Sequence, residues 1–171
     1  PSAAYDPSYL MQYIIQENGS LEYNSMVTMG KNTDSVRLNK YNNMIITTAI
    51  GGYQNYGDDV ANKETSLDIA FLNANGKLTE SKKVVIPNNV SREMRSLKVL
   101  PNGTAYVMCY NIANYGSAVN LDVYKTTVSN LASEKPKEWE KVYEVVEADG
   151  WFGRLDAEYD TNRLWLQVGN E

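Results

Sequence analysis

The chain of 171 residues contains no histidine. This absence excludes from the sequence catalytic triads of the Ser-His-Asp type, zinc sites with imidazole ligands and proton transfer by an imidazole. Cysteine occurs once, as Cys109, so no disulfide can form within the chain. Because Cys109 lies in the apolar run AYVMCY, we expect a small buried hydrophobic side chain there and not a reactive thiol.

Runs of like charge and long apolar runs are also missing. The chain carries 21 acidic and 16 basic residues, a formal net charge of -5, with no run of five or six like charges. We therefore expect no nucleic-acid partner. No apolar stretch approaches the roughly 18 residues that span a bilayer, so membrane insertion is not expected either. The opening PSAAYDPSYL has no initial Met and is rich in Pro, Ser and Ala, which favours an exported or cell-surface protein.

The composition is otherwise that of an ordinary globular protein, with 43% hydrophobic and 22% charged residues. The sequence pattern predicts two kinds of β-hairpin that alternate along the chain. Each hairpin has alternating residues, a polar turn and a β-rich run. Turn residues that tolerate positive φ stand at Asn42-Asn43, Asn102-Gly103, Asp160-Thr161-Asn162, Asn18-Gly19 and Asn75-Gly76, with Ser129-Asn130 in the last hairpin. The first kind covers 35–50, 96–111 and 154–169, and the second covers 9–29, 66–86 and 120–146. Only 91–97 and 131–142 are compatible with a helical turn.

If the strands of the first kind of hairpin are A and B and those of the second kind are C and D, the chain reads C-D, A-B-C-D, A-B-C-D, A-B. Twelve strands in a repeat of 57 to 61 residues are typical of four-stranded antiparallel blades. With phrases such as VLPNGTAYV (99–107) and LDIAFLNANGKL (67–78), the chain resembles a β-propeller, loosely of the lactonase-like or surface-layer type. The resemblance implies an all-β fold with blade repeats near 35–87 and 96–146 and a split blade formed by 8–30 and 154–169.

Three blade equivalents fall below the usual four to eight of a closed ring. The chain is therefore expected to be a single all-β domain that needs a second chain, or a segment of a larger propeller whose other blades lie in cis. Unpaired strand edges and apolar blade faces would be an aggregation hazard, so one of these partners is a physical requirement.

The longer connections are the expected position of function, because binding residues concentrate on loops held by a rigid scaffold. The tripeptide Asn-Tyr-Gly occurs in two of them, at 55–57 and 114–116. Its tyrosines could stack on a sugar or another planar ligand, or could pack over their own blades. Large apolar and cationic residues stand in the other connections, expected at 87–95 and 147–153. The candidate ligand-binding residues are Tyr56, Tyr115, Asn55, Asn114, Trp151, Phe152, Arg92, Arg95 and Arg154.

Metal binding and catalysis have weaker signals. Asp58 and Asp59 offer oxygen ligands that suit calcium, although their spacing matches no defined calcium loop. Carboxylate chemistry of the glycosidase kind needs two nearby acids. Asp68 and Asp122 hold matching positions in two repeats, which favours a structural role, because an active site is normally built once. We therefore expect a non-catalytic binding or scaffold module for a protein or glycan; the alternative is part of a glycosidase-like or lactonase-like propeller hydrolase.

Overall fold

The computed structural model describes residues 7–31, 33–51, 66–90, 93–111, 120–145, 152–158 and 163–169. These residues form twelve strands and one short helix. The elements are β1 (Pro7–Ile15), β2 (Leu21–Lys31), β3 (Thr33–Tyr41), β4 (Met44–Gly51), β5 (Ser66–Leu72), β6 (Leu78–Lys83), β7 (Glu93–Val99), β8 (Thr104–Asn111), β9 (Asn120–Thr127), α1 (Val128–Leu131), β10 (Glu140–Val145), β11 (Phe152–Glu158) and β12 (Arg163–Gly169).

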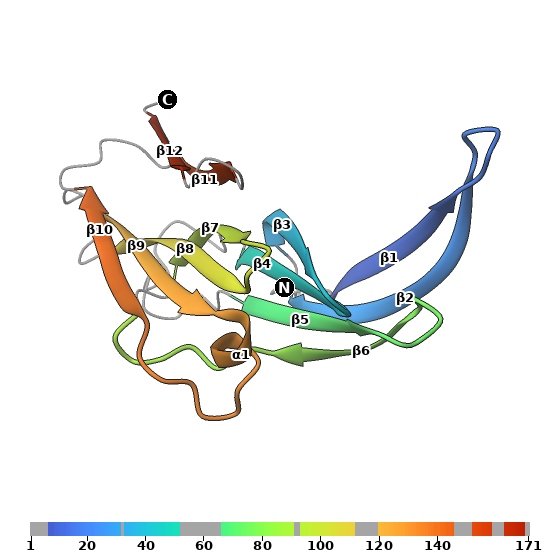
Figure 1. Cartoon of the computed structure of the whole chain (residues 1–171), viewed down its shortest axis with the longest axis horizontal. Helices are drawn as coiled ribbons and strands as arrows, with labels where there is room; N and C mark the ends of the chain where they lie inside the picture. Colours follow the sequence, from blue (N-terminus) through green and yellow to red (C-terminus); the bar gives the residue numbers. More distant parts are fainter. Residues whose placement is uncertain are drawn as a thin grey trace, which may run out of the picture.

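The strands pair in chain order into four antiparallel sheets. β1 and β2 form a two-stranded sheet, β3 to β6 and β7 to β10 form four-stranded sheets, and β11 and β12 form a second two-stranded sheet. The all-β fold class and the expected pairing of hairpins are confirmed. Figure 1 shows the sheets following one another through the molecule, from the β1–β2 hairpin at one end to β11–β12 at the other. The described strands do not close into a ring.

Four of the predicted turns have the backbone that their residues were expected to adopt. Gly19, Gly76 and Gly103 have φ of 81°, 73° and 83°, and Asn42 has φ of 52°. A positive φ is inexpensive for glycine and tolerated by asparagine, which is why these residues mark the hairpin turns. The predicted turn at 160–162 lies outside the described residues.

The prediction of a turn at Ser129-Asn130 is wrong. These residues belong to α1, which begins after Thr127, whose side chain accepts a hydrogen bond of 3.2 Å from the backbone N–H of Asn130. A further stretch of chain then leads through the buried Trp139 into β10. The proposed helical turn at 91–97 is also absent, because β7 occupies 93–99. Pro136, which limits the second proposed helical segment, lies beyond the end of α1.

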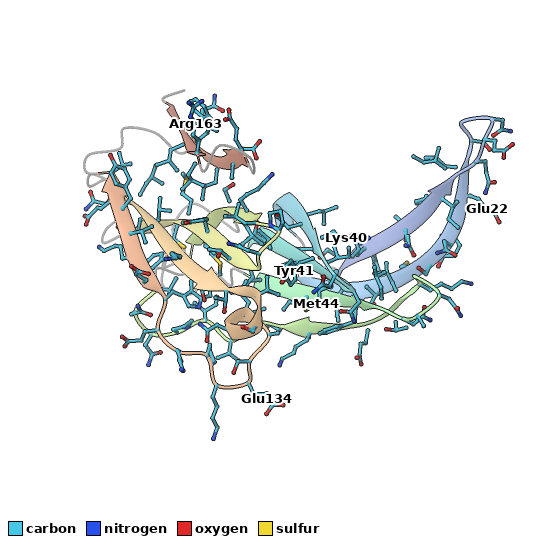
Figure 2. All side chains as sticks on the ribbon, viewed as in Figure 1. Glu22, Lys40, Tyr41, Met44, Glu134 and Arg163 are labelled. Atoms are coloured by element: carbon cyan, nitrogen blue, oxygen red, sulfur yellow. The ribbon has the colours of Figure 1, made fainter. Side chains whose placement is uncertain are left out.

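Two apolar clusters lie between the sheets. The larger one joins the two four-stranded sheets around Ile46, Ile69, Val107 and Trp139. The smaller one joins the β7–β10 sheet to β11 and consists of Met108, Leu121, Val123 and Leu155, with Leu164 and Leu166 of β12 packed against it. Cys109 is buried, as its apolar surroundings in the sequence predicted. Figure 2 shows the side chains that fill the space between the ribbons.

The two ends of the sheets differ in their connections. The β3–β4 and β7–β8 turns are tight and lie together, since Tyr41 of one contacts Gly103 of the other. In an antiparallel sheet the next connection emerges at the opposite end. Residues 52–65 and 112–119 therefore begin and finish at the end of the sheets away from these tight turns: Ala49 is paired with Ser66, and Asn111 with Asn120.

Candidate interaction surfaces

Most of the residues predicted to bind a ligand lie in connections outside the described residues. These are Asn55, Tyr56, Asp58, Asp59, Arg92, Asn114, Tyr115 and Trp151. The strand ends that flank the two Asn-Tyr-Gly segments are described, and they lie at the same end of neighbouring sheets. The strand pairing therefore supports the expectation from the repeat that both Asn-Tyr-Gly segments are attached at the same end of the sheets.

Three predicted site residues lie in strands: Phe152 and Arg95, which were assigned to loops, and Arg154, which was expected at the start of a strand. Phe152 begins β11 opposite Gly169, and Arg154 lies opposite Gln167. Arg95 lies in β7 at the irregularity between Met94 and Ser96. The predicted connections 87–95 and 147–153 were too long by a few residues, because strand pairing begins at Glu93 and Phe152. Arg95 and Arg154 belong to neighbouring strands, since β7 and β11 are in contact.

A groove of about 650 Å³ runs across β3, β7, β11 and β12. On its wall the Nζ atom of Lys98 lies 2.7 Å from Oδ1 of Asp156. The hydrogen bond from Lys98 lowers the pKa of the Asp156 carboxyl below its ordinary value, and the backbone N–H of Ala157 adds to this effect. The groove is lined by Leu38, Asn39, Ser96, Leu97, Lys98, Leu155, Asp156, Trp165, Leu166 and Gln167.

Trp165 is the aromatic residue of this groove, and reasoning from the sequence missed it as a site residue. Its side chain is 53% exposed, and its Nε1 donates a hydrogen bond of 3.1 Å to Oε1 of Glu158. A signal was present in RLWLQVG, because Trp165 shares its side of the strand with Arg163 and Gln167. An aromatic residue on the polar side of an alternating strand indicates an exposed ring.

Polar side chains connect the first strands of neighbouring sheets. The Asn39 side chain on β3 donates to the backbone carbonyl of Leu97 and accepts from the N–H of Val99 on β7, both at 3.0 Å. Ser96 on β7 accepts a hydrogen bond of 3.0 Å from the N–H of Leu155 on β11. These bonds join residues 58 to 60 positions apart, which is one repeat of the sequence. The repeat in the sequence is therefore also a repeat of contacts.

The β1–β2 hairpin presents an exposed apolar face, here called the hairpin surface. Tyr9, Met11, Tyr13 and Ile15 alternate along β1 on one side, and across β2 Met11 is paired with Met26 and Tyr13 with Tyr23. Each large apolar side chain of this surface is between 47% and 75% exposed. The hairpin surface consists of Tyr9, Met11, Tyr13, Ile15, Leu21, Tyr23 and Met26.

The opposite face of the hairpin is attached to the next sheet. Ser25 is buried and its Oγ accepts a hydrogen bond of 3.0 Å from the N–H of Leu78, while it donates to Oε1 of Gln12 at 2.6 Å. Nε2 of Gln12 donates to the carbonyl of Gly76 at 2.8 Å. The hairpin is thus fixed on one side and exposed on the other. Figure 1 shows β1 and β2 extending away from the body of the molecule.

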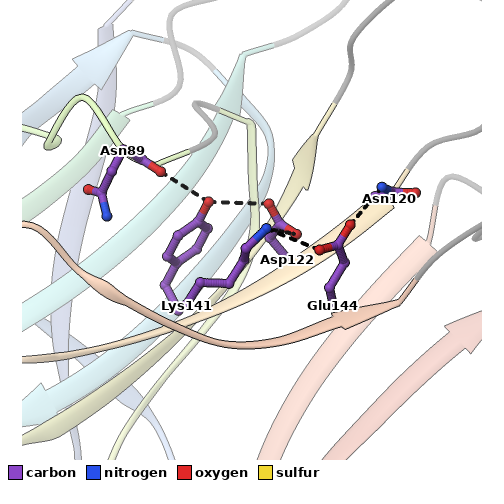
Figure 3. A network of polar contacts seen from close by, with 6 residues as sticks. Asn89, Asn120, Asp122, Lys141 and Glu144 are labelled. Atoms are coloured by element: carbon purple, nitrogen blue, oxygen red, sulfur yellow. Dashed lines mark hydrogen bonds and ion pairs between the residues drawn. The ribbon is translucent and has the colours of Figure 1, made fainter.

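A polar network surrounds Asp122, one of the two matched acids of the repeats. The Asp122 side chain is only 2% exposed and lies 3.4 Å from Nζ of Lys141, while the Tyr124 hydroxyl donates to it at 3.2 Å. Lys141 also contacts Glu144 at 3.1 Å, and Asn120 donates to Glu144 (Figure 3). The ion pair and the hydrogen bond offset the cost of burying this carboxylate, which agrees with the structural role expected for Asp122.

The described residues contain no cluster of three or more Cys, Asp or Glu side chains that could hold a metal ion. The predicted calcium ligands Asp58 and Asp59 lie outside these residues. Among the described helices, none is long and apolar enough to cross a membrane.

Comparisons with known proteins gave no relationship: no family model, no curated protein and no solved structure matches the chain.

Proposed function

We propose that the four sheets are blades and half-blades of a β-propeller. The observation that carries this proposal is the spacing of the contacts between first strands. β3, β7 and β11 are joined in order by Asn39 and Ser96, each bond spanning 58 to 60 residues. In a propeller the first strands of successive blades lie next to one another at one repeat of the sequence, which is the same relationship.

We further propose that this propeller is a non-catalytic binding or scaffold module for a protein or glycan. Its ligand face would be the end of the sheets that carries residues 52–65 and 112–119. Support comes from the length of these two connections. The β3–β4 and β7–β8 turns at the opposite end are tight, and among the described connections there only β9–β10 (128–139) is long. Long connections on a rigid scaffold are the usual position of recognition residues, and the repeated Tyr56 and Tyr115 supply aromatic faces.

A glycan array and a pull-down with the variants Tyr56→Ala and Tyr115→Ala test this proposal. Loss of one stacking contact is expected to weaken binding by about tenfold or more, because such contacts contribute on the order of 1 to 3 kcal/mol. Asn75→Ala is the control at the tight-turn end, where the exposed side chain is expected to have no effect on binding. Equal binding by the tyrosine variants and the control would exclude these tyrosines from the ligand face, and turnover of a bound glycan would favour the hydrolase alternative.

A further inference from the structure

Two of the four sheets among the described residues have only two strands. β1 is paired only with β2, and β12 only with β11. In the blade order, β1–β2 supplies the third and fourth strands of a blade and β11–β12 supplies the first and second. The two half-sheets therefore lack complementary parts, and an unpaired edge strand is a template for pairing with another chain.

The complete sheets show how a second strand meets a third strand. β4 and β5 are antiparallel with Met44 opposite Phe71, and β8 and β9 are antiparallel with Thr104 opposite Thr127. In both cases the first residue of the second strand is opposite the last or next-to-last residue of the third. Applied to the half-sheets, this rule places the start of β12 near the end of β1.

The apolar faces select one register. Leu164 and Leu166 of β12 pack against the cluster of Met108, Leu121, Val123 and Leu155. The rule from the complete sheets allows Arg163 opposite Ile15 or opposite Ile14. Only the second of these registers continues the apolar face into the hairpin surface, with Leu164 opposite Tyr13 and Leu166 opposite Met11. A slip of one residue would bring Trp165, from the other face of β12, to that side, since successive side chains point to opposite faces.

The size of the hairpin surface also favours burial. Its seven large side chains are about half exposed or more. The three tyrosines alone each have on the order of 150 to 250 Å² of surface, so the exposed patch is on the order of several hundred Å². An exposed apolar patch of this size is typical of an interaction surface. No charged residue belongs to this surface.

One exposed aromatic residue lies on the β7–β10 sheet, on the side that packs against β11. Tyr143 of β10 is 55% exposed and is paired with Val123 of β9, so both lie on the side of the sheet that packs against β11. If a strand such as β1 pairs with the free edge of β12, its hairpin partner β2 lies next in the same sheet. That partner must then lie over the side of the β7–β10 sheet that packs against β11, beside Tyr143. The exposed tyrosine is therefore placed to cover part of the hairpin surface.

From these observations we propose that the occupant of the β1 edge is β12 of a second copy of this chain. Each copy gives its β12 to the β1 of the other, through two identical junctions, and the pair forms a ring of six four-stranded sheets. This number lies within the usual four to eight of a propeller. The proposal rests on the blade arrangement proposed above, and it identifies a second copy of this chain as the partner that completes the two half-sheets.

Mass in solution gives the first test. Light scattering coupled to gel filtration is expected to give twice the 19.2 kDa of one chain. Tyr13→Lys and Met11→Lys add a charge at a side chain already exposed in one copy, so each should fold and should raise the dissociation constant by at least about tenfold. The control is Val85→Lys, which changes an apolar residue of similar exposure that follows β6, in a complete sheet and outside both half-sheets, and is expected to leave the mass unchanged.

Disulfide trapping tests the register. When a Tyr13→Cys chain is mixed with a Leu164→Cys chain, a covalent pair of the two different chains is expected, since directly opposed Cα atoms lie about 4.5 to 5.5 Å apart, within the range of a disulfide. Ile14→Cys replaces Tyr13→Cys in the control, because its side chain leaves the other face, and no covalent pair is expected. The native Cys109 is buried and does not interfere.

Two outcomes would overturn the second copy as partner. One is a monomer at every concentration with intact β-sheet circular dichroism. The other is covalent pairing of Tyr13→Cys chains with themselves in preference to Leu164→Cys chains, which means that two hairpin surfaces stack face to face. Neither result concerns the ligand face, because binding through Tyr56 and Tyr115 is measured separately. A monomer that still binds through those tyrosines therefore excludes the dimer ring and leaves the proposed binding function standing.

Discussion

The side chain of Asn39 on β3 holds the backbone of Val99 on β7 through a hydrogen bond of 3.0 Å from the Val99 N–H to Asn39 Oδ1. Asn39 also donates to the carbonyl of Leu97 at 3.0 Å, so one amide serves both a donor and an acceptor of the neighbouring strand. β7 is an edge strand of its sheet: it pairs with β8 on one side and has no partner strand in that sheet on the other. The Asn39 amide thus joins β3 to β7 between two sheets that share no strand pairing.

Replacing this amide is expected to loosen the junction between the sheets. Asn39→Ala should lower the free energy of unfolding by about 1 to 3 kcal/mol, because two partly buried backbone groups lose the partner that Asn39 supplies. Asn39→Asp keeps the acceptor for Val99 but sets a second acceptor against the Leu97 carbonyl, so it should also destabilise the junction. Chemical denaturation measures both, with the exposed turn residue in Asn75→Ala as the control. Equal stability of Asn39→Ala and the control would contradict a role for the amide in holding the sheets together.

A second junction depends on the close approach of Tyr41 to Gly103. A Cβ atom at Gly103 would lie 2.8 Å from the Tyr41 hydroxyl oxygen and 3.1 Å from its Cζ. Gly103→Ala is therefore expected to cost about 2 to 3 kcal/mol, from the positive φ together with the displacement of Tyr41. Gly76→Ala is the matched control, because φ is also positive there and nothing lies within 4 Å of the added Cβ, so only about 1 kcal/mol is expected.

The background variant Tyr41→Phe separates the two costs at Gly103. It removes the hydroxyl that makes the closest contact, so Gly103→Ala should cost less in this background than in the natural sequence. Thermal or denaturant unfolding of the four proteins measures the difference. An unchanged cost would mean that the positive φ alone accounts for the loss and that Tyr41 moves without penalty.

The part of the fold that was predictable from the sequence is the part that local chemistry determines. Alternation along strands and the turn residues Asn42, Gly19, Gly76 and Gly103 predicted the hairpins, because a positive φ is a property of single residues. The helix α1 was missed: Ser129-Asn130 has the composition of a turn, yet Thr127 caps a helix there.

The candidate sites were less predictable, because they depend on contacts between distant residues. Lys98 has no local signal for its pairing with Asp156, 58 positions away. The bond from Leu155 to Ser96 is likewise formed only when the sheets meet. Trp165 could have been identified as exposed from its side of the strand, but its place beside a groove required the neighbouring β3 and β7. The repeat in the sequence predicted which strands correspond, whereas the polar side chains that join them came only from the structure.

The pair formed by Lys98 and Asp156 predicts a dependence of stability on acid pH. The pKa of Asp156 is lowered in the folded protein, first by the hydrogen bond from Lys98 and then by the N–H of Ala157. Its contribution is therefore present above the ordinary carboxyl pKa and is lost as the pH falls through the lower, folded pKa. The effect should be small, on the order of 0.5 kcal/mol, because the Asp156 side chain is 72% exposed.

Unfolding measured between about pH 2 and pH 6 tests this dependence. Asp156→Asn removes the titrating group and should flatten the acid limb of the stability profile relative to the natural sequence. Lys98→Met removes the cation and should shift the same limb toward higher pH, since the pKa of Asp156 then returns toward its ordinary value. A profile for Asp156→Asn that retains the full acid limb would assign this limb to other carboxyls.

Lys141 is expected to matter more for stability than the other lysine paired within its sheet. It lies beside the buried Asp122, and Lys141→Met removes the cation from a carboxylate whose side chain is 2% exposed. The expected cost is about 1 to 2 kcal/mol, below that of a fully buried pair because Lys141 itself is about half exposed. In the control variant Lys125→Met the lost partner is the exposed Glu140 at 3.6 Å, and the cost should stay within about 0.5 kcal/mol.

Alkaline pH distinguishes this electrostatic role from the packing of the Lys141 stem. The hydrogen bond to Glu144 raises the pKa of Lys141 above its ordinary value, with further help from Asp122 against the opposing effect of burial. The stabilisation is therefore complete below the ordinary lysine pKa of 10.5 and is lost as the pH rises through the folded pKa. The stability difference between the natural sequence and Lys141→Met should shrink over that range, whereas Lys141→Arg, which stays charged, should keep it. A difference that is the same at neutral and alkaline pH would mean that the stem, and not the charge beside Asp122, stabilises the sheet.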